Sequence, residues 1–387
     1  MNIRVAGTGH TPFGTSKKEI GELMLEAVEE ALSQANAKAD DVDTIFIANF
    51  SSSFAGQSHL PALLASKLKT NAEIVRVESA CASGGLAVKE AVVALSSGLY
   101  KTALVVGVEK MNASTISEVT GILASAASPD EIIHGATFPS LYALIARQHF
   151  AKYGTTEEHL AMVSAKNHQN ARKNILAQFK KDIKVEDVLK SKMVASPLKL
   201  LDCSPITDGA AAVFLCNQEV ADKFTSKEYP SVDIIGIGHS SDSISLLDRK
   251  DLTVMPAVVK AALKAYAMGS ISPQQIDVAE LHDCFTIAEI VEMEDLGLCN
   301  KGQATAMITE GKTAIDGMLP INPSGGLKAK GHPVGATGVS QVVEITKQLQ
   351  GRCGERQVRK AETGLCCNVG GSGATAVVTI LKRGMER

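Results

Sequence analysis

The sequence predicts an α/β fold made of two tandem copies of one α/β unit, with a further segment inserted into the first copy. An amphipathic helical pattern in the first half recurs in the second, and a polar link and a β-rich run follow each helix. The two sets of apolar positions are Met24, Val28, Leu32 and Ala35, and Met255, Val259, Leu263 and Tyr266. Both halves also end in a small-residue turn and a strand, DGAAAVFLC at 208–216 and GATAVVTIL at 373–381. Chance similarity between two alanine-rich helices is the alternative explanation.

Composition excludes several classes of protein. The 387 residues suffice for two to three domains, and 45% hydrophobic with 21% charged residues is typical of a folded globular protein. A net charge of −3 gives no basic field for nucleic acid. No apolar run reaches the ~18 residues of a membrane span. The N-terminus resembles no targeting peptide, and eight cysteines without zinc spacing are too few for a disulfide scaffold. We therefore expect a cytoplasmic protein with reduced thiols and no metal site.

The first half begins with a strand in MNIRVAGTGHTPFG and contains the segment VESACASGG at 77–85. Its small residues permit a tight turn, and the apolar positions that follow predict a helix ending near Gly98. Cys81 is thus expected at or near a helix N-terminus. Free backbone N–H groups and the helix dipole there can lower the pKa of a thiol and bind an oxyanion. A buried structural cysteine is the alternative interpretation.

The segment from about Asn112 to Cys203 has no counterpart in the second half. Residues 166–192 within it carry eight basic and three acidic side chains. One interpretation is a solvated helical face, and the other is a local positive surface for a phosphorylated ligand. A small anion suits a local patch in an acidic protein better than a nucleic acid duplex does.

The second half contains NPSGGLKAKGHPVGATG at 322–338, a glycine- and proline-rich loop that leads into a helix. His332 is flanked there by Gly331 and Pro333, which fix its backbone at the mouth of the helix. If the halves are copies, this loop lies roughly where Cys81 lies in the first half, and the pseudo-twofold brings Cys81 and His332 together. A surface histidine is the alternative.

These segments resemble the motif set of the thiolases, in the right order along the whole chain: ESACASGGLA, TDGAAAV, NPSGGLKAKGHPVGATG and NVGGSGATAV. In that family, a nucleophilic cysteine and the GHP histidine act on acyl-CoA thioesters, and these roles carry over to Cys81 and His332. The resemblance also implies a pantetheine-contacting serine at Ser204 and an oxyanion-binding backbone amide at or near Gly370. Phe138 and Pro139 are candidates for the lining of the acyl pocket.

The resemblance implies a thiolase fold, that is, two similar core domains of mixed five-stranded sheets layered with helices. The N-terminal core domain would comprise residues 1–113 and 205–226. Residues 114–204 would form an inserted loop domain that binds CoA, and residues 227–387 the C-terminal core domain.

The sequence departs from the usual thiolase pattern at two motifs. Residues 282–285 read HDCF where most thiolases have NEAF, and 366–370 read CCNVG where most have CxG. HDCF marks the sterol-carrier-protein-type thiolases and bacterial and archaeal relatives, in which its cysteine is thought to replace the CxG thiol. This implies that Cys284 is the proton shuttle and that His282 donates to the enolate oxygen. Ungapped counting from the terminal Gly-Ala instead makes Cys367 the shuttle; we favour Cys284.

The implied activity is that of an acyltransferase in lipid and fatty acid metabolism, working through an acyl-cysteine intermediate. It condenses two acetyl-CoA to acetoacetyl-CoA and CoA, or cleaves 3-ketoacyl-CoA with CoA. CoA thioesters are substrates, no cofactor is required, and a homodimer or homotetramer is expected. HDCF beside GHP disfavours a ketoacyl or hydroxymethylglutaryl-CoA synthase. A thiolase-like synthase or scaffold subunit, in a complex with a hydroxymethylglutaryl-CoA synthase and an OB-fold partner, is the alternative.

Overall fold

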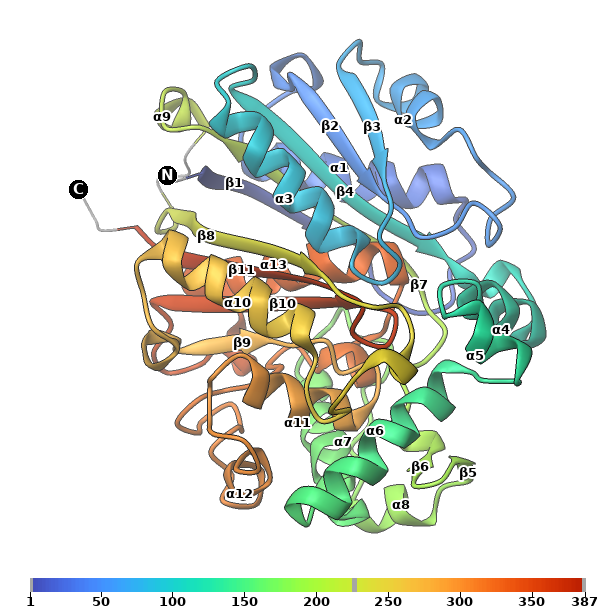
Figure 1. The fold of residues 1–387 in the computed structure, drawn as a ribbon. Helices are drawn as coiled ribbons and strands as arrows, with labels where there is room; N and C mark the ends of the chain where they lie inside the picture. The colour runs from blue at the N-terminus through green and yellow to red at the C-terminus, as the bar shows by residue number, and fades with distance from the viewer. Residues whose placement is uncertain (1–2, 225–227, 385–387) are drawn as a thin grey trace.

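The structure is a computed structural model that describes residues 3–224 and 228–384. Within these residues, one mixed sheet has nine strands in the order β3-β2-β4-β7-β1-β8-β11-β10-β9 (Figure 1). Its strands are β1 (Ile3–His10), β2 (Thr44–Ala48), β3 (Glu73–Val77), β4 (Thr102–Lys110), β7 (Asp208–Cys216), β8 (Val232–Ser241), β9 (Val278–Glu280), β10 (Thr363–Gly370) and β11 (Thr375–Arg383). A separate two-stranded sheet pairs β5 (Met193–Ala195) with β6 (Leu198–Lys199).

Helices cover both faces of the large sheet. They are α1 (Ile20–Gln34), α2 (Leu60–Leu68), α3 (Ser83–Ser96), α4 (Ile116–Ala124), α5 (Pro129–Ile133), α6 (Phe138–Tyr153), α7 (Glu157–Arg172), α8 (Val185–Lys190), α9 (Ala221–Phe224), α10 (Pro256–Gly269), α11 (Thr286–Asp295), α12 (Ala304–Thr309) and α13 (Thr337–Leu349). No described helix is both long and apolar enough to cross a bilayer.

The nine-stranded sheet consists of two similar halves that meet where β1 pairs with β8, over Ile3–Val5. The first half has five strands, as expected, with β2 parallel to β3 and β4 and with β7 antiparallel to β4 and β1. The described part of the second half has four strands, β8, β11, β10 and β9. At the fifth place, Ile321 forms a single parallel bridge with Ala279. Pro320 and Pro323 lack the N–H groups that a longer ladder needs, which explains the shortened strand.

The two halves enclose a central helical layer. Apolar residues of α3 and α13 pack together with strand residues from both halves of the sheet in one buried cluster. Helices α1 and α2 pack on the outer face of the first half, and α10 and α11 on the outer face of the second. Strands between two helical layers are buried on both faces, and every residue of β7 is buried. The resulting order of layers is α/β/α/β/α (Figure 1).

Glycines allow the N-terminal ends of α3 and α13 to approach each other. A Cβ on Gly84 would lie 2.7 Å from the backbone nitrogen of Gly338, and a Cβ on Gly338 would lie 2.2 Å from that of Gly85. Because Cys81 precedes α3 and His332 precedes α13, this contact brings together two loops that are far apart in the sequence.

Helices α4–α8 and the β5–β6 pair belong to the segment that the sequence analysis treats as an insertion. The chain then returns to the first half through β7, which lies between β4 and β1. Helices α6 and α7 of the insertion pack on the α10 and α11 side of the second half. The boundaries at residues 113 and 204 remain a prediction, and the boundary at residue 226 lies outside the described residues.

Candidate active site

Cys81 lies in a turn between β3 and α3 that hydrogen bonds of the Ser83 side chain hold in place. Ala80 before it has a φ of +48°, in the left-handed region that side-chain-bearing residues adopt at an energetic cost. The Ser83 hydroxyl donates to the Ala80 carbonyl (2.6 Å) and accepts from the Ser79 N–H (2.8 Å). The helix begins at Ser83, so Cys81 lies just outside its N-terminus.

The expectation that the helix lowers the pKa of Cys81 is wrong. Burial raises the pKa of this thiol to about 12; the N–H groups of Gly371 and of Cys81 itself oppose the shift, and the Glu109 carboxylate adds to it. Nearby helix donors are already taken: Asn368 Oδ1 accepts from the Gly85 N–H (2.9 Å). The resting residue is therefore a thiol, and it loses its proton only when a base removes it.

Two histidines lie beside this thiol. One ring nitrogen of His282, one of His332 and Sγ of Cys81 all lie within 4.8 Å of one another. The two rings cross edge to face, with centroids 5.1 Å apart. His332 comes from the loop before α13 and His282 from the segment after β9, so the structure assembles the group from both halves.

The hydrogen bonds of His332 leave its Nε2 free to accept a proton. The Thr337 hydroxyl donates its single hydrogen to the Pro333 carbonyl (3.1 Å), so it accepts from Nδ1–H of His332 (2.7 Å). Nε2 of the neutral ring then carries a lone pair. Burial lowers the pKa of His332 to about 3, which keeps the ring neutral near pH 7. Burial, with a contribution from His332, also holds the pKa of His282 well below its usual range.

A pocket of about 350 Å³ opens beside these residues. Cys81, Cys284, His332 and Ser204 all line it. Most of its other walls are apolar and come mainly from the insertion: Met111, Val119, Leu123, Phe138, Pro139, Tyr142, Val194, Ile206 and Phe285. Phe138 and Pro139, the candidates for an acyl-pocket lining, therefore both line this pocket. The pocket therefore combines nucleophilic and basic groups with an apolar wall.

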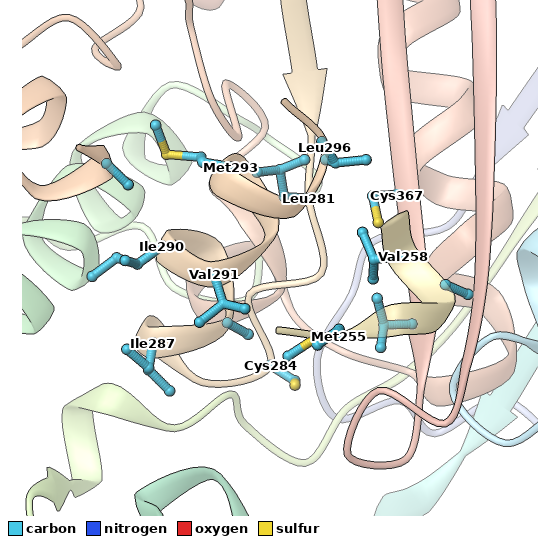
Figure 2. Packing of buried hydrophobic residues seen from close by; sticks show 14 of the residues in the cluster. Met255, Val258, Leu281, Cys284, Ile287, Ile290, Val291, Met293, Leu296 and Cys367 are labelled. Atoms are coloured by element: carbon cyan, nitrogen blue, oxygen red, sulfur yellow. The ribbon is translucent and has the colours of Figure 1, made fainter. Parts of the chain in front are cut away.

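The structure separates the two candidate proton-transfer thiols. Cys284 and Cys367 belong to the same packed cluster (Figure 2), but of the two only Cys284 lines the pocket. Cys367 is fully buried on β10 and faces the carboxyl of Glu292. Burial is the main cause that raises the pKa of this thiol, and the Glu292 carboxyl raises it further. Burial also raises the pKa of Cys284 well above its usual range, and the Tyr142 hydroxyl faces this thiol. Cys284 is the thiol that a bound molecule could reach.

The position expected for the second oxyanion-binding amide is shifted by one residue. Gly370 still belongs to β10, where it pairs with Thr375. The N–H that faces the Cys81 sulfur belongs to Gly371, in the turn after the strand. The amides of Cys81 and Gly371 therefore form a pair of donors at the nucleophile. Ser204 is held nearby through its N–H, which donates to the Cys284 carbonyl (2.9 Å).

The basic stretch contains cations in ion pairs with acidic side chains and a set of exposed lysines. Lys166 forms an ion pair with the buried Glu289 (2.7 Å), and its Nζ donates to the Ile321 carbonyl. Arg172 is paired with Asp182 (2.7 Å). The exposed lysines of the stretch are Lys180, Lys181, Lys184, Lys190 and Lys192. These lysines offer an open positive surface, together with the exposed Arg172, whereas the charge of Lys166 is compensated by Glu289.

Two further residues organise the site and were given no role in the sequence analysis. Asn368 contacts both the Cys81 backbone and His282, and Thr337 contacts His332. Asn368 lies in the terminal NVGG motif and Thr337 in the GHP motif, and this was the only sequence feature that could have indicated them. Their functions depend on partners that no local pattern reveals.

Comparison with known proteins agrees with this geometry. The family described as "Thiolase, N-terminal domain" matches residues 3–219, and "Thiolase C-terminal domain-like" matches residues 238–383. The chain belongs to the thiolase family. As a thiolase it is an acyltransferase by family, and the two matched regions meet around Cys81 and His332.

Curated thiolase relatives match over almost the whole chain. An acetyl-CoA acetyltransferase of Methanothermobacter thermautotrophicus is 44% identical over 386 residues, covering 99% of this chain and 100% of the relative. Sterol carrier protein 2 of Bos taurus is 33% identical, covering 99% of this chain and 72% of that protein.

Solved structures share the fold. The Ltp2-ChsH2(DUF35) aldolase has a TM-score of 0.86 at 24% identity, covering 99% of this chain and 98% of that one. An acetyl-CoA acetyltransferase from Syntrophomonas wolfei has a TM-score of 0.75 at 19% identity, covering 99% of both chains. Both confirm the thiolase fold.

Proposed function

We propose that this protein catalyses CoA-dependent Claisen condensation of acyl-CoA thioesters, and the reverse thiolytic cleavage, through an acyl-Cys81 intermediate. The arrangement that carries the proposal is Cys81, His332 and Cys284 on the wall of one apolar pocket, with His282 beside Cys81 and His332. The identity of 44% to an archaeal acetyl-CoA acetyltransferase supports acetyl-CoA as a substrate.

The first half-reaction transfers an acyl group to Cys81. As Sγ bonds to the thioester carbonyl carbon, the Cys81 proton passes to Nε2 of His332, which its contact with Thr337 keeps free of hydrogen. The negative carbonyl oxygen is bound by the amides of Cys81 and Gly371. When the carbonyl re-forms, the C–S bond to CoA breaks, and the departing thiolate takes the proton of the Cys284 thiol.

The second half-reaction forms the carbon–carbon bond. The Cys284 thiolate removes an α-proton from a second acyl-CoA, and hydrogen-bond donors at His282 and protonated His332 stabilise the enolate oxygen. The enolate carbon attacks the acyl carbonyl, and the bond to Cys81 breaks. The Cys81 sulfur then recovers its proton from His332, while Cys284 keeps the α-proton, so both thiols end protonated as they began.

The raised pKa of Cys284 suits this exchange of roles. A thiol whose charged form is disfavoured by burial stays protonated until the CoA thiolate leaves. Once formed, its thiolate is a strong base, which the weakly acidic α-proton requires. Cys367 is excluded from this step in our proposal because it does not face the pocket.

We assign the exposed lysines of residues 180–192 to the phosphates of CoA. Lys192 lies two residues before Val194, a lining residue, so the C-terminal end of this cationic segment adjoins the pocket wall in the sequence. Reversing Lys180 and Lys181 to Glu should raise KM for CoA and leave kcat nearly unchanged, because only uniform binding is lost. Reversing the two exposed lysines Lys260 and Lys264 of α10 to Glu is the matched control. Equal KM values in both variants at low salt would place CoA elsewhere.

Further expectations belong to the same proposal. We propose a cytoplasmic enzyme of lipid and fatty acid metabolism that needs no cofactor and forms a homodimer or homotetramer. In the described residues β3 ends the sheet with Val75 49% exposed, and an exposed edge strand favours pairing with another chain. Light scattering of the purified protein measures this assembly.

Cleavage of acetoacetyl-CoA with CoA tests the activity. Purified wild-type protein should form acetyl-CoA, and Cys81→Ser should lose at least ~100-fold in turnover because an alcohol is much harder to ionise. A synthase would show no CoA-dependent cleavage. A scaffold subunit would show none in isolation, and its Cys81→Ser variant would behave like the wild type in the complex.

A further inference from the structure

Three groups at the centre of the site form a set that commonly binds zinc. Cys81, His282 and His332 each offer a ligand atom within 4.8 Å of the others. Zn²⁺ takes thiolate sulfur at ~2.3 Å and imidazole nitrogen at ~2.0–2.1 Å, so a small contraction would complete three bonds. The chemistry proposed above needs a free thiol and a hydrogen-bond donor instead. A contact in the structure must therefore determine whether these side chains bind a metal ion or serve as a free thiol and a hydrogen-bond donor.

The contacts of Asn368 decide it. Its Oδ1 accepts from the Gly85 N–H (2.9 Å), and its Nδ2 donates to the Cys81 carbonyl (2.9 Å). A backbone N–H can only donate and a carbonyl can only accept, so these two partners fix the orientation of the amide. Nδ2 also lies 3.1 Å from Nδ1 of His282. Nδ1 therefore faces an N–H and must accept.

We infer that Asn368 is a positioning residue that holds His282 as its Nε2–H tautomer, so that His282 acts as a hydrogen-bond donor and the site is closed to divalent metal. A neutral imidazole that accepts at Nδ1 carries its hydrogen on Nε2. That nitrogen can donate to an enolate oxygen but has no lone pair for a metal. Metal-binding histidines show the opposite arrangement, in which the second ring nitrogen donates to a carboxylate, carbonyl or water.

The two histidines are consequently held in opposite tautomers. Thr337 accepts from His332 and leaves its Nε2 bare, whereas Asn368 donates to His282 and leaves its Nε2 protonated. One ring can take the Cys81 proton while the other already presents a donor. This inference rests on the proposed function for its catalytic meaning, but the tautomers and the metal binding can be measured without activity.

Asn368→Asp tests the inference by replacing the donor with a group that only accepts. The carboxylate can still accept from the Gly85 N–H, and it now accepts from Nδ1–H of His282. Nε2 then carries a lone pair, and the three ligand atoms become available together. With Co²⁺ as the probe, we expect a thiolate-to-cobalt absorption band and an affinity about 10–100-fold above wild type, the range of effects at second-shell metal contacts.

Two controls separate this effect from a general one. Asn368→Asp combined with Cys81→Ala should lose the thiolate band, which identifies the ligand. Gln341→Glu makes the same amide-to-carboxylate change at a fully buried position whose amide donates to the Cys367 carbonyl. It should bind Co²⁺ no better than wild type. A wild-type protein that binds Co²⁺ as tightly as Asn368→Asp, with the same band, would overturn the inference.

A measurement on the wild-type protein covers the case in which Asn368→Asp does not fold. ¹⁵N-histidine NMR reports which ring nitrogen is protonated, with His282→Gln and His332→Gln used for assignment. We expect protonated Nε2 in His282 and protonated Nδ1 in His332; protonated Nδ1 in His282 would refute the inference.

In a folded Asn368→Asp variant, Cys81 should still be acylated by acetyl-CoA, while exchange of the α-protons should fall at least ~10-fold because the enolate loses a donor. Unchanged exchange would remove the catalytic part of the inference. Failure of wild-type acylation would instead count against the proposed function, and the NMR and cobalt results would still stand.

Discussion

The pH dependence of Cys81 alkylation follows directly from the buried state of its thiol. With a pKa of about 12 in the protein and ~8.5 for a free cysteine, the thiolate fraction near pH 7.5 is lower by a factor on the order of 10³. Iodoacetamide needs the thiolate, so it should modify Cys81 about 10³-fold more slowly than a model thiol. Because the pKa is raised, the reactive form is lost as the pH falls, and the rate should increase about tenfold per pH unit from 7 to 10.

The assay is peptide mapping of alkylated Cys81 by mass spectrometry at fixed times across this pH range. Acetyl-CoA should protect Cys81, and the urea-unfolded chain is the control that returns the rate to that of a model thiol. Acylation by acetyl-CoA should remain fast at pH 7, because His332 removes the proton in the same step and no free thiolate is required. An alkylation rate that reaches a plateau below pH 9 would show an activated thiolate and refute the reasoning.

The remaining predictions concern proton transfer and helix packing. Cys284→Ala should abolish exchange of acetyl-CoA methyl protons in deuterated buffer while Cys81 is still acylated, whereas Cys367→Ala should keep the exchange and lose some thermal stability through a small cavity; the reverse pattern would mean that Cys367 is the base. Gly338→Ala should lower the free energy of unfolding by about 1–3 kcal/mol or more and reduce activity, because its Cβ would lie 2.2 Å from the Gly85 nitrogen and 2.3 Å from Asn368 Oδ1. Gly121→Ala in α4, where a Cβ meets nothing within 4 Å, should be neutral or stabilising by up to about 1 kcal/mol, and chemical denaturation of both variants measures the difference.

Local patterns in the sequence were sufficient for the duplicated α/β architecture and for the position of the two main site residues. Apolar spacing marks α1 and α10 because a helix buries one face at a period that neighbouring residues alone define. Cys81 and His332 stand out because small residues and glycines around them permit tight turns at helix starts. These patterns depend only on neighbouring residues, so they can be recognised without knowledge of the fold.

The tertiary structure alone decided how these residues behave. The pKa of Cys81 depends on burial and on the N–H of Gly371, which comes from the other half of the chain. The same holds for Lys166, whose charge is paired with Glu289 in the interior, and for the choice between Cys284 and Cys367, which only the pocket distinguishes. Solvation and hydrogen bonding are set by whatever packs against a group in space. Both therefore depend on how the two halves pack together. A local sequence pattern does not show which distant side chain will exclude water from a given group.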